Sequence, residues 1–222
     1  MTNVQAARGP GRPPRLTRSQ VVAAAREIAA RHGTARLTMR RLAEALGVMP
    51  NALYTYFPDK SSILDAVLDD LVGDVERPNP RMGWRAGLVS LMSSYRRVLL
   101  AQPGLVALTA ARPMVGSNAS RLREDMLTLL RAGVLDEGDV VSAYLALFAY
   151  TTGFVTFETG RVPGKRDTKQ RARTFELHAG LPDADFPSTR ALARRLRKRP
   201  GDLEFRRGLN ALLTGFAEAG DS

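Results

Sequence analysis

The chain has no cysteine and only two histidines, His32 and His178, among its 222 residues. The lack of cysteine excludes disulfides and thiolate metal sites. Two isolated histidines make a histidine-based metal centre unfavourable, so we expect no metal and no cofactor. A Ser-His-Asp arrangement is compatible with the residue counts, but the sequence contains no Gly-x-Ser-x-Gly turn and no phosphate loop. We therefore expect a protein that is not an enzyme.

Acidic residues are scarce relative to basic ones, with 22 Asp and Glu against 33 Lys and Arg, a formal net charge of +11. Residues 1–60 hold ten basic and three acidic residues (+7), residues 61–160 hold nine and eleven (−2), and residues 161–200 hold twelve and four (+8). Basic blocks are typical of phosphate binding. A solvated arginine-rich surface gives the same counts, so charge alone does not separate the two interpretations. We interpret the block from Lys165 to Arg199 as such a surface.

Long apolar runs are also scarce. The one candidate, 140–157, reads VVSAYLALFAYTTGFVTF and is close to the minimum length for crossing a membrane. It contains several hydroxyl residues and a glycine, so a helix buried on several sides is the simpler interpretation. No apolar segment follows the arginines of the N-terminus, and we expect a cytoplasmic protein without a membrane partner.

Helical spacing dominates the remaining sequence, and no convincing strand pattern appears. Thr17 and Gln20 form a capping box for a first helix that stops at Gly33. Thr38 caps a second helix, Pro50 suits the first turn of a third, and Asp59 caps a fourth. Further helices are expected at 84–99 and near 105–112, 118–132, 138–160, 187–198 and 202–218, whereas 161–186 is predicted to be a long, partly ordered connection. The fold class predicted is all-α.

The segment 38–56 has the pattern of a helix-turn-helix, in which Gly47 allows the turn between two short helices. Leu53 and Phe57 are four residues apart and should point inward together. Asn51, Ala52, Thr55 and Tyr56 then lie largely on other faces, where an asparagine reads adenine and a small methyl group meets thymine. The hydroxyls of Tyr54 and Tyr56 can bond to phosphate. The alternative is that both tyrosines are half-buried packing residues, and for Tyr54 the two interpretations fit equally well.

The runs LTMRRLAEALGV and PNALYTYFPDKSSILDAV resemble the DNA-binding domain of the TetR family of bacterial transcriptional regulators. The C-terminal EFRRGLNALLTGFAEAG resembles the last dimerisation helix of its tetracycline-repressor-like members. Met49-Pro50 departs from the small or polar residues common there. The resemblance implies base contacts from Arg40, Asn51, Ala52 and Thr55, and backbone contacts from Thr38, Tyr54, Tyr56 and Lys60.

Residues 1–15 form a basic arm rich in proline and glycine, which we expect to be flexible. Its Gly-Arg-Pro sequence is similar to minor-groove-binding segments, which would make Arg8 and Arg12 DNA contacts. A disordered basic leader explains the same residues. The expected organisation is this arm, a DNA-binding domain at 16–62, and a regulatory domain for ligand binding and dimerisation at 63–222.

The family resemblance implies a homodimer built on the helices near 138–160 and 202–218, with a ligand pocket among helices of 84–160. Candidate pocket residues are aromatic or flexible apolar residues and two polar outliers, although most of the apolar ones fit a plain core equally well: Trp84, Tyr95, Leu108, Arg112, Met114, Tyr144, Phe148, Phe154, Phe157 and Glu158. Phe154 and Phe157 are expected on one helical face. Glu158 fits a polar ligand end, a solvated helix end, or a pair with Arg161.

These features predict a ligand-responsive regulator, a repressor that binds a palindromic double-stranded DNA operator as a dimer. A small, mostly apolar effector would release it, because 144–157 is rich in aromatics and poor in charge. The alternative is an architectural or ligand-independent DNA-binding protein. The large apolar middle of the chain disfavours that alternative.

Overall fold

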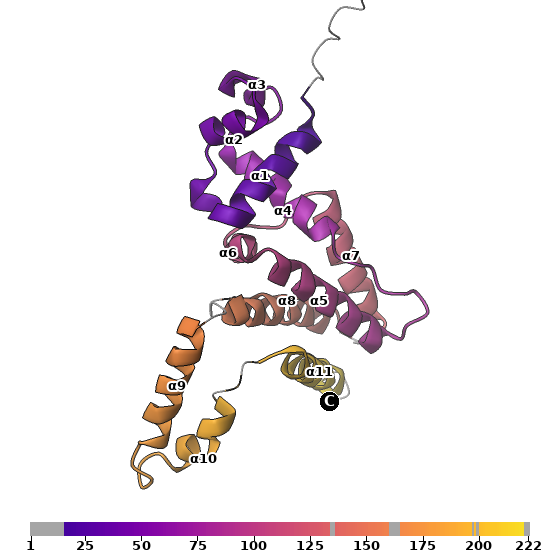
Figure 1. The fold of residues 1–222 in the computed structure, drawn as a ribbon. Helices are drawn as coiled ribbons and strands as arrows, with labels where there is room; N and C mark the ends of the chain where they lie inside the picture. The colour runs from indigo at the N-terminus through magenta and orange to yellow at the C-terminus, as the bar shows by residue number, and fades with distance from the viewer. Residues whose placement is uncertain (1–15, 134–135, 160–164, 197, 199, 220–222) are drawn as a thin grey trace, which may run out of the picture.

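The computed structural model describes residues 16–133, 136–159, 165–196, 198 and 200–219. Within these residues the chain forms helices and no strand, as the sequence predicts (Figure 1). The elements are α1 (Arg18–His32), η1 (Thr34–Arg36), α2 (Met39–Leu46), α3 (Pro50–Tyr54), α4 (Lys60–Gly73), α5 (Trp84–Ala101), α6 (Pro103–Ala111), α7 (Ser117–Arg131), α8 (Glu137–Thr159), α9 (Lys165–Ala179), α10 (Pro187–Leu196) and α11 (Asp202–Ala219).

The first four helices begin where the capping signals predict. The Thr17 side chain accepts a hydrogen bond from the backbone N–H of Gln20, and the Gln20 side chain closes the capping box. Asp59 and Ser62 form a second capping box at α4, and at α2 the Thr38 side chain accepts a hydrogen bond from the Arg41 N–H. Hydrogen bonds from Ser62 lower the pKa of the Asp59 carboxyl, so this cap is charged at neutral pH. Short-range chemistry therefore sets the boundaries of the N-terminal unit.

In the N-terminal unit, α1 packs against both α4 and α2, and α2 packs against α3. Leu53 and Phe57 are both fully buried, as their four-residue spacing predicts. Gly47 has a left-handed backbone (φ +65°), which ends α2 and turns the chain into α3. α4 continues past this unit and also packs on α7, so a domain boundary after residue 62 falls near the start of a helix that both parts share. That boundary stays a prediction.

The larger unit is a bundle of α5, α6, α7, α8 and α11. α8 is its central helix and contacts the other four. By length and composition α8 is also apolar enough to cross a membrane. It contacts four other helices of the bundle, and 33% of its most apolar stretch is buried. At the top of the bundle, α6 touches α1. A Cβ on Gly104 would lie 2.5 Å from the Ala30 carbonyl oxygen, so glycine permits this close approach.

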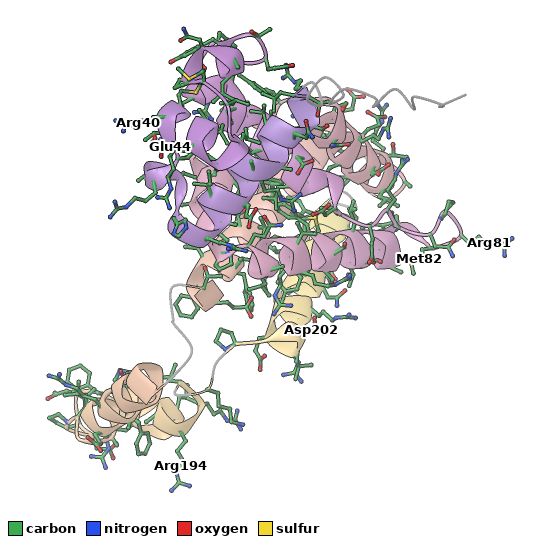
Figure 2. The ribbon with its side chains drawn as sticks, turned by 45° about the horizontal axis from the view of Figure 1, so that its top comes forward. Arg40, Glu44, Arg81, Met82, Arg194 and Asp202 are labelled. Atoms are coloured by element: carbon green, nitrogen blue, oxygen red, sulfur yellow. The ribbon has the colours of Figure 1, made fainter. Side chains whose placement is uncertain are left out.

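The predicted connection at 161–186 is wrong over much of its length, because α9 occupies 165–179. Its sequence, KRDTKQRARTFELHA, has no continuous apolar stripe, which is the signal that sequence patterns use to identify a helix. α9 packs mainly on α10, and the pair extends away from the bundle as a helical hairpin (Figure 1). Arg194 on α10 lies at the opposite end of the molecule from Arg40 of α2 (Figure 2).

Candidate DNA interface and effector cavity

The short helix α3 presents an exposed face at one end of the molecule. Burial of Leu53 fixes its orientation, and Pro50 occupies its first turn, where the missing N–H costs nothing. Asn51 and Thr55 are exposed, Ala52 is half-buried, and Tyr54 is 52% exposed. Asn51, Ala52 and Thr55 are therefore at least partly accessible, as base contacts require, and those contacts stay a prediction. Met49, at the N-cap of α3, is 77% exposed, an unusual position for a large apolar side chain.

Helix α2 adds polar groups beside α3. Arg40 is exposed and pairs with Glu44 one turn later, with Nε 3.0 Å from the carboxylate (Figure 2). Such an exposed pair contributes little to stability, so Arg40 could leave it at small cost to make the base contact that the family resemblance implies. Thr38 uses its oxygen to accept from the Arg41 N–H, and its hydroxyl proton stays available for a phosphate.

Tyr56 has a different environment from Tyr54. Its hydroxyl donates to the backbone carbonyl of Leu16, which ties the end of α3 to the start of α1. The family resemblance implies that Tyr56 contacts the DNA backbone. While the bond to Leu16 holds, its hydroxyl proton is not available for a phosphate. Lys60 is half-buried at the first turn of α4. Arg8 and Arg12 lie outside the described residues.

Arg26 of α1 connects the N-terminal unit to the bundle. Its guanidinium donates to the side chain of Gln102 (2.9 Å), which lies between α5 and α6. It also donates to Asp70 of α4 (2.7 Å) and to Asp74, the C-cap of α4. Only 16% of the Arg26 side chain is exposed. One side chain therefore joins α1, α4 and the start of α6.

An apolar cavity of about 910 Å³ lies between α6 and α8. Its aromatic lining comes from Tyr144, Phe148 and Phe157, and its hydroxyl lining from Thr109, Thr152 and Thr156. The remaining lining residues are small or aliphatic: Ala110, Leu145, Ala149 and Gly153. None of these described lining residues is charged. The volume is within the range of pockets that hold drug-sized molecules.

The structure brings three of the ten predicted ligand residues to this cavity: Tyr144, Phe148 and Phe157. The others do not line it: Trp84, Tyr95, Leu108, Arg112, Met114, Phe154 and Glu158. Sequence reasoning missed the threonines and small residues. On α8, lining residues occur as adjacent pairs that repeat every four residues from Tyr144 to Phe157. This periodic stripe is the sequence pattern that could have identified the missed lining residues.

The two polar outliers form ion pairs away from the cavity. Arg112 donates from Nε to Asp65 of α4 at 2.8 Å. Glu158 accepts two hydrogen bonds from Arg96 of α5, at 2.7 and 2.8 Å, and the two side chains are only 12% and 11% exposed. The expectation of a solvated Glu158 at a helix end is therefore wrong, because Arg96, far away in the sequence, lies next to it.

Phe154 and Phe157 face different neighbours. Phe154 packs edge-on against Phe205 of α11, with ring centroids 5.3 Å apart, whereas Phe157 lines the cavity and is 52% exposed. The expectation of one shared face is wrong. A step of three residues turns roughly 300° around a helix, so the Phe154 and Phe157 side chains point in directions about 60° apart. That difference is enough to place them against different neighbours.

A second groove, of about 560 Å³, runs between α8 and α11. Most of its lining is small or apolar, and one residue is charged: Gly208, Ala211, Leu212, Gly215 and Phe216 of α11, with Tyr150 and Asp139 of α8. A Cβ on Gly208 would collide with the Tyr150 hydroxyl, which donates to the Phe205 carbonyl at 3.0 Å. The groove is a shallow apolar surface on the two helices that the family resemblance implies in dimerisation.

Comparison with known proteins agrees with this geometry. The family model "Bacterial regulatory proteins, tetR family" matches residues 21–67, and the model "Tetracyclin repressor-like, C-terminal domain" matches residues 77–219. A transcriptional regulator of Saccharopolyspora erythraea is 33% identical over 92% of this chain and 86% of its own length. The transcriptional repressor DrrR1 of Streptomyces coeruleorubidus is 33% identical over 83% of this chain and 64% of its own length.

Among solved structures, ActR of Streptomyces coelicolor in complex with actinorhodin superposes with a TM-score of 0.85 at 27% identity, covering 93% of this chain and 99% of that one. The matched models extend over both units of the fold, from α1 to α11. Members of this family are regulators and not enzymes. The chain belongs to the TetR family of bacterial transcriptional regulators.

Proposed function

We propose that this protein is a cytoplasmic transcriptional repressor that binds a palindromic operator as a homodimer and is released by a small, mostly apolar effector. The observation that carries the proposal is that α6 spans from the effector cavity to the DNA-binding unit. Thr109 and Ala110, near its C-terminal end, line the cavity. Gly104, near its N-terminal end, lies against the carbonyl groups that end α1.

This contact supplies a route by which the effector changes DNA affinity. A molecule that fills the cavity would press on the C-terminal part of α6. The N-terminal part has no free space, because Gly104 already approaches the Ala29 and Ala30 carbonyls closely, and Arg26 joins Gln102 to α4. A displacement of α6 would therefore move α1 and α4 together. The effector must bind the displaced state more tightly than the DNA-binding state.

The proposed dimer uses α8 and α11. Val141 of α8 and Leu203 of α11 are more than half exposed, and the Leu212 groove lies between the same helices. Small residues such as Gly215 allow helices of a second copy to approach closely. A two-fold dimer presents two α3 helices to successive major grooves, roughly 34 Å apart, so a small rotation of each DNA-binding unit suffices to lose the operator.

The absence of charged residues in the described cavity lining supports an uncharged effector. Actinorhodin, which is bound to the similar ActR, is the molecule to screen first. The test is a footprint of the purified protein on DNA upstream of its own gene, followed by titration of the complex with candidate molecules. Protection of a palindrome that is lost on adding an apolar ligand is the expected result. Binding that no ligand changes would favour an architectural, ligand-independent protein.

A further inference from the structure

Met49 stands at the N-cap of α3 and is the most exposed large apolar side chain of the described residues. Single exposed apolar residues are ordinary on protein surfaces and need no explanation by themselves. The N-cap, however, favours serine, threonine, asparagine and aspartate, because their side chains accept a hydrogen bond from the first turn of the helix. Methionine is a poor acceptor, and no side chain caps α3. Met49 therefore contributes neither a cap nor much burial to the fold.

The turn before α3 directs the Met49 side chain outward. Val48 packs against the core, and its N–H donates to the Ala43 carbonyl at 3.0 Å, which fixes the chain after α2. Met49 itself has an extended backbone (φ −72°, ψ 144°), and successive side chains of an extended chain point to opposite sides. Its carbonyl then accepts from the Ala52 N–H at 2.9 Å. The outward direction of Met49 is thus set by hydrogen bonds on both sides of it.

The place of Met49 in the fold is that of a base-reading residue. In a helix-turn-helix, the N-terminal residues of the second helix contact base edges in the major groove. The exposed Asn51 follows on α3, and the exposed Arg40 lies on α2, which packs against α3. Unlike these polar neighbours, a thioether forms no strong hydrogen bond to a phosphate or a base. The apolar group that base edges present in the major groove is the C5 methyl group of thymine.

We propose that Met49 is a specificity-determining residue whose side chain packs against a thymine methyl group in each half of the operator. The flexible, polarisable methionine side chain adapts readily to such a contact. It adds apolar discrimination to the hydrogen bonds predicted for Asn51. Serine at this N-cap would stabilise α3, so the fold gives up stability at a position where the DNA complex gains selectivity. The inference rests on the proposed function, because it requires α3 to enter the major groove.

The test measures the coupling between Met49 and individual thymine methyl groups. The DNA is the palindrome that the full-length protein protects in the footprint. Each thymine is replaced in turn, in both half-sites, by deoxyuridine, which keeps the base pair and removes only the methyl group. Fluorescence anisotropy then gives the affinity of the wild type and of Met49→Ser for each duplex. At one thymine position the replacement should weaken the wild type by roughly fourfold per half-site, the effect of burying one methyl-sized group, and should leave Met49→Ser unchanged.

Two further measurements separate base reading from a structural role. Met49→Ser should keep or raise the melting temperature, because serine can cap α3 and little packing is lost. Its affinity for random DNA should equal that of the wild type. Met82→Ser is the matched control, since Met82 is 43% exposed on the loop between α4 and α5, well away from Arg40 of α2 (Figure 2). This control should respond to deoxyuridine as the wild type does.

Several outcomes would overturn the inference. They are a wild type that no deoxyuridine weakens, a loss at each thymine that Met49→Ser retains in full, and a melting temperature that falls in Met49→Ser. An equal loss of operator and random DNA in Met49→Ser would also overturn it, because the contact would then be with the sugar-phosphate backbone. If the protein protects no palindrome, the proposed function fails and the inference fails with it. If the palindrome is bound and only the coupling is missing, the proposed function stands and the inference alone is wrong.

Discussion

The ion pair between Arg96 and Glu158 should stabilise the bundle. Its removal should lower the free energy of unfolding and should not change the affinity for the effector. Both side chains are about nine-tenths buried, and the guanidinium makes two hydrogen bonds to the carboxylate. Loss of one partner of a buried pair costs about 3–5 kcal/mol, because the other charge stays buried without compensation. Asp202 lies 3.4 Å from the same guanidinium and compensates in part, which places Glu158→Leu toward the lower end of that range.

Glu158→Gln keeps one oxygen acceptor and removes the charge, so the free energy of unfolding should fall by about 1.5–3 kcal/mol, the range for a hydrogen bond to a charged group. Asp202→Asn is the matched control. Its side chain is 59% exposed, and it should cost about 1 kcal/mol or less. Urea unfolding followed by circular dichroism, at one fixed protein concentration, measures all three variants.

The reasoning is refuted if Glu158→Leu and Asp202→Asn cost the same, since the buried pair would then contribute no more than an exposed one. It is also refuted if Glu158→Gln keeps wild-type stability but needs more effector to release DNA. That result would place the Glu158 carboxylate in the effector site, as one interpretation of the sequence suggested.

Four further predictions concern the DNA interface and its links to the rest of the fold. Asn51→Ala should lose about 1–3 kcal/mol of discrimination between operator and random DNA. Lys60→Ala should weaken binding to operator and random DNA alike and reduce the slope of log affinity against log salt by about 0.9. Fluorescence anisotropy at several salt concentrations separates the two effects, and an equal loss of affinity for operator and random DNA in Asn51→Ala would remove Asn51 from the base-reading set. Tyr56→Phe should lower the free energy of unfolding by about 0.5–1.5 kcal/mol through loss of one hydrogen bond, and a large drop in DNA affinity at unchanged stability would show a phosphate contact instead. Gly104→Ala should cost about 1–3 kcal/mol by overpacking against the end of α1 and change the effector concentration needed for release, and a variant identical to wild type in both respects would contradict the role of α6. Leu212→Glu should convert the dimer to a monomer in analytical ultracentrifugation, and an unchanged dimer would place the interface elsewhere.

Local signals predicted the DNA-binding unit well. The caps at Thr17, Thr38 and Asp59, the turn at Gly47 and the buried pair of Leu53 and Phe57 depend on residues within a few positions of one another. Such interactions can be read from sequence because the helix fixes their geometry. The exposure of the α3 face then follows from which side is buried.

Long-range contacts explain what the sequence did not predict. Glu158 and Arg96 meet only after α5 and α8 pack together, and nothing near Glu158 in the sequence indicates that partner. Phe154 and Phe157 are divided between α11 and the cavity by the rotation of α8, which the packing of the whole bundle decides. α9 was missed because its polar sequence has no apolar stripe, the signal on which helix prediction depends.

The most direct test of the central claim is the release of operator DNA from a variant whose cavity is filled. Gly153 lines the cavity, and a Cβ added there would have no atom within 4 Å, so Gly153→Leu occupies ligand space without a clash at its first carbon. Fluorescence anisotropy of labelled operator is followed while a small molecule that releases the wild type is added. We predict that Gly153→Leu binds the operator like the wild type and stays bound at concentrations that release the wild type. Release of the variant at the wild-type concentration would contradict a cavity between α6 and α8 as the effector site.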